Sequence, residues 1–385
     1  MSVQARFDLP ARAESLAFLG VVMAARPPER ILDDIIQKKG RGAPVRRKLA
    51  VNKERNWLLG LTLNSFAKLA DGAQLTDLEQ SIVTAFRKNG FSDEEIKQQG
   101  RLSKRISKQV RAEIFPTRFA RLDPSKSYSF EDLKGDAEDI VEAILARPNV
   151  TRVDVQSIHA GESALRDFPL VDRSTLQEYA SEMLVAIAPN VTPPNPRFTI
   201  KATSFRCIDR QTDSIFGPSN EPYWIFGSLG GGTTVTTRSQ IFGDVDNGET
   251  RTFASNEGCI WGQNCAAQDL PDGEIGSLVS LWEHDEGNVE EIRAGVAAAF
   301  AAAAGILAAT GVAAWVGAVV AGVGAVVAWL LGFLDDDHIA DQTFVFTREV
   351  VQKQLPNVGQ SFNVTRRFAD GDGDYSLNMR VTHVS

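Results

Sequence analysis

The sequence predicts an α+β protein of several domains, in which a helical N-terminal domain is followed by an antiparallel β-sandwich that carries an inserted hydrophobic α-helical hairpin. Three observations support this prediction. Apolar residues recur at helical spacing in residues 1–190, they alternate as in strands in residues 197–385, and residues 294–334 contain no charged side chain. Between the first two parts, residues 191–196 form a Pro-rich linker, because closely spaced prolines interrupt helices and strands alike.

The N-terminal domain, residues 1–190, is predicted to be mainly helical and basic. Residues 61–121 read as several helices, and residues 129–147 as one amphipathic helix that begins at a Ser and ends at an Arg-Pro pair. Residues 150–158 alternate like a strand, and residues 173–188 are predicted as a further helix. The domain is therefore expected to be a helical bundle with little β-structure.

Part of this bundle resembles the helix-turn-helix of LuxR-type regulators. The residues that match that pattern in order are Leu75, Thr76, Glu79, Gly90, Ser92, Glu95, Ile96 and Ser103, whereas Lys97 and Gly100 depart from it. The resemblance implies a basic recognition helix at residues 103–114. Its nucleic-acid contacts would be Lys104, Arg105, Lys108 and Arg111. A DNA-binding regulatory protein is thus one alternative function, and a helical bundle with a basic face is the simpler interpretation of the same residues.

Charge is divided unevenly along the chain. The net charge of the 385 residues is −8, yet the first third is rich in Lys and Arg and the remainder is rich in Asp and Glu. A basic segment suits nucleic acid, anionic lipid or an acidic partner, and an acidic one suits cations. Nucleic acid is therefore a candidate partner for the N-terminal part only.

The cysteines and the N-terminal residues indicate the compartment in which the protein is made and acts. Cys207, Cys259 and Cys265 are too few for a disulfide scaffold, so we expect them reduced, although Cys259 and Cys265 would be able to bridge in an oxidising compartment. The apolar stretch at residues 16–25 is short and follows acidic residues, unlike a cleavable signal peptide. The expectation is synthesis in the cytoplasm and action at a membrane, after export by a dedicated machine.

The order of motifs after residue 197 is similar to the C-two domain, the lipid-binding sandwich of the protein kinase C type. Cys207-Ile208-Asp209 precedes Asn220-Glu221-Pro222-Tyr223, and the segments at residues 281–285 and 336–340 match the motifs that flank the third loop of that family. Short strands separated by Gly, Asp and Asn agree with such a sandwich. If the resemblance holds, the hairpin is inserted at the lipid-facing tip of the sandwich.

The same resemblance implies a calcium site built from loop carboxylates, since Ca²⁺ prefers about six to eight oxygen ligands. The candidate metal ligands are Asp209, Glu221, Glu283, Asp285, Asp336 and Asp337. The alternative is that these acidic residues only keep the loop ends hydrated.

The uncharged segment at residues 294–334 is about twice the length of roughly 20 residues that one membrane-spanning helix needs. We therefore predict two helical arms, at residues 294–309 and 312–331, with the turn at Thr310-Gly311. Ala, Gly and Val dominate the segment, and small residues at four-residue spacing let helices approach closely in lipid. The predicted membrane-inserting residues are Phe300, Ile306, Leu307, Trp315, Val319, Val320, Trp329, Leu330, Leu331 and Phe333.

No catalytic motif stands out, so enzymatic activity is not expected. The leading hypothesis is a membrane-active, pore-forming or membrane-inserting toxin or effector, whose hairpin resembles the hydrophobic hairpin of pore-forming colicins. The expected partners are a lipid bilayer and, through self-association, further copies of the chain. A further alternative is a structural or assembly protein whose hairpin is buried in an oligomer.

Overall fold

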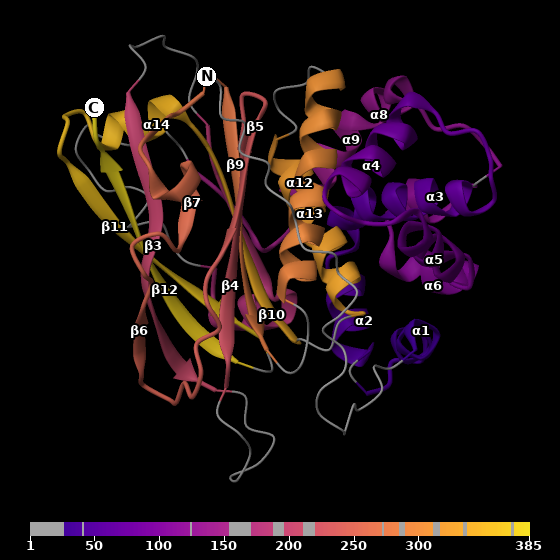
Figure 1. The fold of residues 1–385 in the computed structure, drawn as a ribbon, viewed down its shortest axis with the longest axis horizontal. Coiled ribbons are helices and arrows are strands. Elements are labelled where there is room, and N and C mark those ends of the chain that lie inside the picture. Colours follow the sequence, from indigo (N-terminus) through magenta and orange to yellow (C-terminus); the bar gives the residue numbers. More distant parts are fainter. Residues whose placement is uncertain are drawn as a thin grey trace, which may run out of the picture.

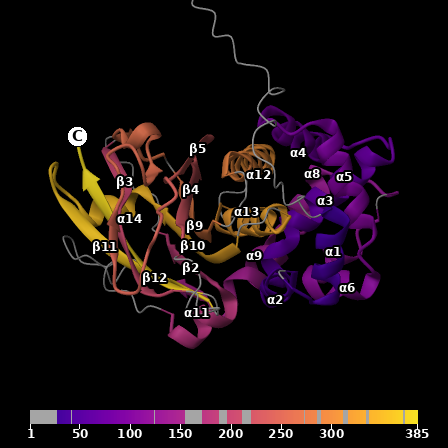
Figure 2. The same cartoon turned by 60° about the horizontal axis from the view of Figure 1, so that its bottom comes forward.

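The computed structural model describes most of the chain. The described residues are 27–40, 42–123, 125–153, 171–187, 196–210, 220–271, 273–284, 289–310, 316–333, 337–370 and 373–385. They form four layers, in the order sheet, sheet, hairpin and helical bundle (Figures 1 and 2). The protein is thus α+β, with an N-terminal helical region followed by β-sheets, as the sequence predicts.

The helical bundle comes from the N-terminal part. Its elements are α1 (Pro28–Gln37), α2 (Gly42–Val51), η1 (Lys53–Asn56), α3 (Trp57–Ala70), α4 (Asp77–Lys88), α5 (Asp93–Lys104), α6 (Lys108–Ile114), α7 (Thr117–Ala120), α8 (Phe130–Gly135) and α9 (Ala137–Leu145). Capping boxes begin α4 at Thr76 and α5 at Ser92. The single helix predicted at residues 129–147 is wrong in detail, because α8 and α9 are separate helices that meet at Asp136.

Two sheets form the β-sandwich. Sheet A has the order β1-β2-β10-β9-β4-β5 and sheet B the order β11-β12-β3-β6, with β7 and β8 also paired to β3. The strands are β1 (Val150–Arg152), β2 (Ser181–Ala186), β3 (Arg197–Asp209), β4 (Pro222–Gly230), β5 (Thr233–Arg238), β6 (Thr250–Thr252), β7 (Cys259–Trp261), β8 (Gln268–Asp269), β9 (Glu274–Glu283), β10 (Asp337–Thr347), β11 (Ser361–Ala369) and β12 (Asp374–His383). Two short helices, α11 (Arg173–Tyr179) and α14 (Arg348–Gln354), and the single turn η3 (Gln263–Cys265) complete this part.

The structure corrects the predicted sandwich in two respects. Sheet A is mixed rather than antiparallel, because β1 pairs parallel to β2 and β2 pairs parallel to β10. The helix predicted at residues 173–188 ends at Tyr179, and Ala180 adopts a left-handed conformation before β2 begins. Since β1 and β2 precede the Pro-rich linker but belong to sheet A, the boundary predicted at residue 190 passes through the sheet.

The hairpin consists of α12 (Val289–Thr310) and α13 (Val316–Leu331). Helix α12 ends at the residue where the turn was predicted. The hairpin connects β9 to β10, which are neighbouring strands in the middle of sheet A. It does not project from the tip of the sandwich, as the C-two resemblance implied, but lies across the face of sheet A, with the helical bundle packed against its other side (Figures 1 and 2).

Two hydrophobic cores result. One lies between the sheets and includes Trp224, Phe226 and Val279, and the other joins the near face of sheet A, the hairpin and the helical bundle. Successive residues of β4 alternate between the two cores, because side chains of a strand point to opposite faces. The hairpin is therefore a layer shared by both halves of the molecule, while the sandwich keeps a core of its own.

Candidate functional site

The candidate functional site is the hairpin together with the surfaces that hold it. Two strand glycines create the space for it on sheet A. A Cβ atom at Gly227 of β4 would lie 2.0 Å from the ring of Phe300 in α12, and one at Gly276 of β9 would lie 2.5 Å from Val320 in α13. Glycine in the interior of a strand allows this close approach, which a side chain would prevent.

The opposite side of the hairpin is fitted to the helical bundle. Gly322 of α13 lies against Trp57 and Leu58, and the indole nitrogen of Trp57 donates a hydrogen bond to the backbone oxygen of Ala318 at 3.1 Å. Near the other end of α13, the indole of Trp329 donates to the side-chain oxygen of Gln99 at 3.3 Å. Helix α13 therefore contacts protein on both sides.

Most predicted membrane-inserting residues are buried inside the protein. Phe300, Ile306, Val319, Val320, Trp329 and Leu330 are buried, whereas Leu307 and Phe333 are partly exposed. Trp315 and the side chain of Leu331 lie outside the described residues. Within the described chain, one helix, residues 290–310, is long and apolar enough to cross a membrane, and half of its most apolar window is buried. Such a helix is also compatible with the core of a water-soluble protein.

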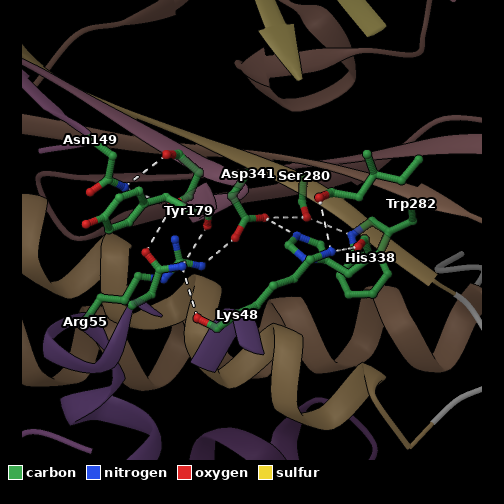
Figure 3. A network of polar contacts seen from close by, with 11 residues as sticks. Lys48, Arg55, Asn149, Tyr179, Ser280, Trp282, His338 and Asp341 are labelled. Atoms are coloured by element: carbon green, nitrogen blue, oxygen red, sulfur yellow. Dashed lines mark hydrogen bonds and ion pairs between the residues drawn. The ribbon is translucent and has the colours of Figure 1, made fainter. Parts of the chain in front are cut away.

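A buried polar network lies at the base of the hairpin, where β9 leads into it and β10 leaves it (Figure 3). The side chain of Asp341 lies 2.8 Å from Nε2 of His338 and accepts a hydrogen bond from the hydroxyl of Ser280 at 2.7 Å. The indole nitrogen of Trp282 donates to the same hydroxyl at 2.7 Å. Sheet A thus contributes four linked side chains to the network.

The helical bundle contributes the cations. Arg55 of η1 donates to the second carboxylate oxygen of Asp341 at 2.6 Å. Lys48 of α2 pairs with Asp370 at 2.7 Å and donates to the backbone oxygens of His338 and Ile339, the latter at 3.2 Å. These contacts fasten the helical bundle to the strand that follows the hairpin.

The hairpin itself touches this network. A Cβ atom at Gly324 of α13 would lie 2.9 Å from the guanidinium of Arg55 and 3.1 Å from the carboxylate of Asp341. The missing side chain lets the apolar helix pack directly over the ion pair. The network and the hairpin are therefore one structural unit.

Burial and charge determine the protonation states. Burial alone would raise the pKa of Asp341, but hydrogen bonds from His338 and Ser280 and the charge of Arg55 lower the pKa below its ordinary value, so Asp341 is an anion. Burial lowers the pKa of His338, with Lys48 and Arg55 adding to the effect and Asp341 opposing it. We therefore assign His338 as neutral at pH 7, with its Nε2–H donating to Asp341. Within the described structure, Nδ1 of His338 is buried without a hydrogen-bond partner.

The types of residue in this network resemble those of a catalytic triad, but their arrangement does not. The hydroxyl of Ser280 donates to Asp341 rather than to His338, and it is itself buried. A serine nucleophile needs a base within hydrogen-bond reach and access to a substrate. The geometry fits a structural clamp, not a nucleophile and its base.

The four predicted calcium ligands that the structure describes, Asp209, Glu221, Glu283 and Asp337, share one end of the sandwich. Glu283 lies opposite both Pro222 and Asp337 in sheet A, and Asp209 lies opposite Asp374 in sheet B. However, no three Asp, Glu, His or Cys side chains among the described residues are placed to hold a metal ion. Glu283 instead accepts a hydrogen bond from the backbone N–H of Glu221 at 3.3 Å. The residues Asp285 and Asp336 lie outside the described part. The described residues alone give no support to the calcium site.

The predicted recognition helix at residues 103–114 is wrong. Helix α5 ends at Lys104 and α6 begins at Lys108. Lys104 pairs with Asp71 at 2.6 Å and Arg105 pairs with Asp33 at 2.7 Å. Arg111 is turned inward, where burial lowers its pKa and its guanidinium donates to the backbone oxygen of Ala120. These three cations therefore bind the protein's own groups.

Packing accounts for Gly100, one of the two residues that depart from the helix-turn-helix pattern. A Cβ atom at this position would lie 2.2 Å from the backbone oxygen of Phe66. Helix α5 thus packs closely against α3, which fits the simpler interpretation of a helical bundle. Lys104 and Arg105 form surface ion pairs within the bundle, whereas Lys108 is exposed.

The expectation of three reduced cysteines is also wrong. Cys259 and Cys265 form a disulfide, and Cys207 is free and buried. The disulfide closes a short loop at the edge of sheet B, beside β7. The alternative bridge considered from the sequence is the one that forms.

Sequence reasoning missed the polar network. Its one sequence signal is position, because Trp282 and His338 flank the apolar segment on its two sides. Lys48 and Arg55, by contrast, belong to a basic cluster that resembles an exposed loop.

Comparisons with known proteins identify no family. No protein-family model matches the chain, and no curated protein matches it. Among solved structures, similar chains include human GIVD cytosolic phospholipase A2 in complex with methyl gamma-linolenyl fluorophosphonate, with a TM-score of 0.24 and 8% identity, covering 49% of this chain and 17% of that chain. The complex of the same enzyme with this inhibitor and terbium chloride has a TM-score of 0.22 and 8% identity, covering 50% and 18%. This chain spans less than a fifth of those proteins, and at these scores neither a C-two domain nor a colicin-like hairpin is confirmed.

Proposed function

We propose that this protein is membrane-active: it keeps the hairpin buried between sheet A and the helical bundle, and it inserts the hairpin into a lipid bilayer when the two halves separate. Lipid association is the broader part of the proposal, and a pore-forming toxin or effector is the specific form. The observation that supports it most is the position of the hairpin between the helical bundle and a β-sandwich that has a separate core of its own.

The separation of the two cores supports the proposal that the hairpin is released. Among the described residues, the core between the sheets contains none from the hairpin, so the sandwich retains its own packing when α12 and α13 move away. The other core is built around the hairpin and would be lost. Removal of the hairpin would expose apolar surface to water, at a free-energy cost of about 25 cal/mol per Å². Only another apolar environment compensates this cost. A lipid bilayer supplies that environment.

The hairpin composition suits both locations. In the folded chain, Gly317 allows close contact of α13 with sheet A, and Gly322 and Gly324 allow close contact with the bundle. In a bilayer, small residues at four-residue spacing allow α12 and α13 to pack against each other. With 22 residues, α12 has a length of about 33 Å, which matches a hydrocarbon core of about 30 Å. Helix α13 has 16 residues and spans about 24 Å, so it would need adjoining residues to cross.

The disulfide supports action outside a reducing cytoplasm. Disulfides form and persist mainly in oxidising compartments. The bond between Cys259 and Cys265 therefore favours an exported protein, as the proposed role at a target membrane requires.

A disulfide lock tests the function. A Cβ atom at Gly305 of α12 would lie 2.8 Å from Oγ of Ser81 in α4, so the double variant Ser81→Cys/Gly305→Cys joins the hairpin to the bundle. The measurement is release of a dye from liposomes containing anionic lipid. The proposal predicts release by the wild type and by each single variant, and at least about tenfold less release by the locked double variant.

The controls separate locking from damage. Reduction of the double variant should restore release to the level of wild type treated with the same reductant. A chain lacking residues 294–334 should release no dye. Equal release by the locked variant and the wild type would show that the hairpin has a structural role only.

A further inference from the structure

His338 occupies a position from which it is able to control the hairpin. It lies on β10, directly opposite Trp282 of β9, and the two ring centroids are 4.5 Å apart. The hairpin begins after β9 and ends before β10. His338 and Trp282 therefore close the base of the hairpin, where its two ends are held together.

The charges around His338 are balanced as they stand. The groups that face it are Asp341 on its own strand, Ser280 and Trp282 on β9, Lys48 on α2, Arg55 on η1 and Asp370 after β11. Lys48 and Arg55 match the anions Asp341 and Asp370 in number. Asp337 and Glu283 are adjacent in sequence to the pair His338 and Trp282, and strand alternation directs them to the other face of the sheet.

Protonation of His338 would disturb this balance. The proton must go to Nδ1, since Nε2 already donates to Asp341, and Nδ1 has no acceptor among the described residues. The imidazolium would have a buried Nδ1–H without an acceptor. It would also be a third cation beside Lys48 and Arg55. A buried donor or charge without a partner is unfavourable, so the network would gain stability by opening to water.

We infer that the network of His338, Asp341, Arg55 and Lys48 is an acid-sensitive latch: protonation of His338 separates the helical bundle from sheet A and uncovers α13. The contact of Gly324 with Arg55 and Asp341 transmits this change, because the same ion pair supports the middle of the helix. The consequence for membranes depends on the proposed function, whereas the opening of the latch does not.

The direction of the pH effect follows from linkage. The pKa of His338 in the folded protein lies below its ordinary value of 6.5. The open or unfolded state therefore binds the proton first as the pH falls. The contribution of neutral His338 to the stability of the closed latch is complete above pH 6.5 and is lost as the pH falls below that value.

Hydrogen exchange of the full chain at pH 7.5 and pH 5.0, without lipid, tests the latch. After correction for intrinsic exchange, the wild type should show at least about tenfold faster exchange in α13, α2 and η1 at pH 5.0, with little change in sheet B. The variant His338→Gln keeps a donor for Asp341 but has no titrating group, so its exchange should not depend on pH. The control His284→Gln replaces another histidine near the hairpin and should behave like the wild type.

A second measurement on the wild type decides the matter if His338→Gln fails to fold. The histidine ring signals are followed by NMR from pH 8 to pH 4.5. The latch predicts that His338 stays neutral below pH 6.5 and that its protonation coincides with faster exchange in α13. Protonation of His338 near pH 6.5 without any change in exchange would overturn the inference.

The outcomes distinguish the latch from the proposed function. Acid-dependent opening without dye release would retain the latch and reject membrane insertion. Dye release and hydrogen exchange in α13 that are both the same at pH 7.5 and pH 5.0 would retain membrane insertion and reject the latch.

Discussion

Arg55 and Asp341 form a buried ion pair at 2.6 Å that joins the helical bundle to sheet A directly beneath α13. The side chain of Asp341 is 1% exposed and that of Arg55 is 13% exposed, so water screens the pair poorly. A buried ion pair is weak evidence for stability in itself, but the loss of one member is costly. The pair therefore specifies how the two halves of the protein meet.

The first prediction concerns this pair. Arg55→Ala leaves the carboxylate of Asp341 without its cation, so the free energy of unfolding should fall by about 3–5 kcal/mol. The exposed pair of Arg293 and Glu290 provides the control, because Arg293→Ala should cost no more than about 1 kcal/mol. Chemical denaturation at pH 7 measures both. Similar small losses for the two variants would contradict the role assigned to Arg55.

The second prediction concerns the space that Gly276 leaves for α13 on sheet A, here called the α13 slot. Gly276→Val adds a side chain where a Cβ atom would already lie 2.5 Å from Val320, so the variant should lose about 1–3 kcal/mol of stability and loosen the hairpin. Gly243→Ala is a matched control, since no atom lies within 4 Å of a Cβ there. Thermal unfolding and exchange in α13 report the two effects. Wild-type exchange in Gly276→Val would show that the hairpin does not depend on this slot.

The third prediction concerns Glu274 at the start of β9. Burial raises its pKa to about 7, well above the ordinary value of 4.5. The folded state therefore holds the proton more tightly than the unfolded state. Its contribution to stability is greatest below pH 4.5 and is lost as the pH rises through 7.

Ionisation of buried Glu274 lowers the stability of the folded state, and Glu274→Gln removes the ionisable group. The variant should be more stable than the wild type at pH 8.5, by up to about 3 kcal/mol, and should show no such gain at pH 4.5. The exposed residue Glu131 on α8 serves as the control through Glu131→Gln, which should have no effect at either pH. A gain at pH 8.5 that persists unchanged at pH 4.5 would contradict the titration of Glu274.

The fourth prediction concerns nucleic acid. Lys104 and Arg105 pair with Asp71 and Asp33, so these cations are engaged within the bundle. The charge reversals Lys104→Glu and Arg105→Glu should change stability by about 1 kcal/mol or less and leave DNA affinity unchanged. A mobility-shift assay with the full chain at physiological salt checks this. Specific binding that the reversals abolish would restore the regulator hypothesis.

Much of the architecture could be predicted from local sequence. The capping residues Thr76 and Ser92 begin helices, and the uncharged segment at residues 294–334 contains two helices that end and begin near the expected turn. These features are local, because helix starts and apolar runs depend on residues close together in the chain. The general α+β organisation follows from the same periodicities.

The rest depends on contacts between distant parts of the chain. Residues 181–186 have the composition of a short apolar helix or strand, and pairing with β10 determines that they form β2. In the same way, Lys48 and Arg55 resemble an exposed basic loop until β10 brings Asp341 and Asp370 to them. The sequence shows that the hairpin is apolar, but only the structure shows that both its sides are covered.

The most direct test of the account follows the hairpin itself. Ala308 is exposed on α12, so the variant Ala308→Cys accepts an environment-sensitive dye without disturbing the folded state, and Ser361→Cys on β11 gives a control label on sheet B. Dye fluorescence is measured with anionic liposomes at pH 7.5 and pH 5.0. The account predicts a blue shift at Ala308 on acidification with liposomes present, none at Ser361, and none at Ala308 in the Ser81→Cys/Gly305→Cys lock. An Ala308 label that stays in water under every condition would contradict membrane insertion of the hairpin.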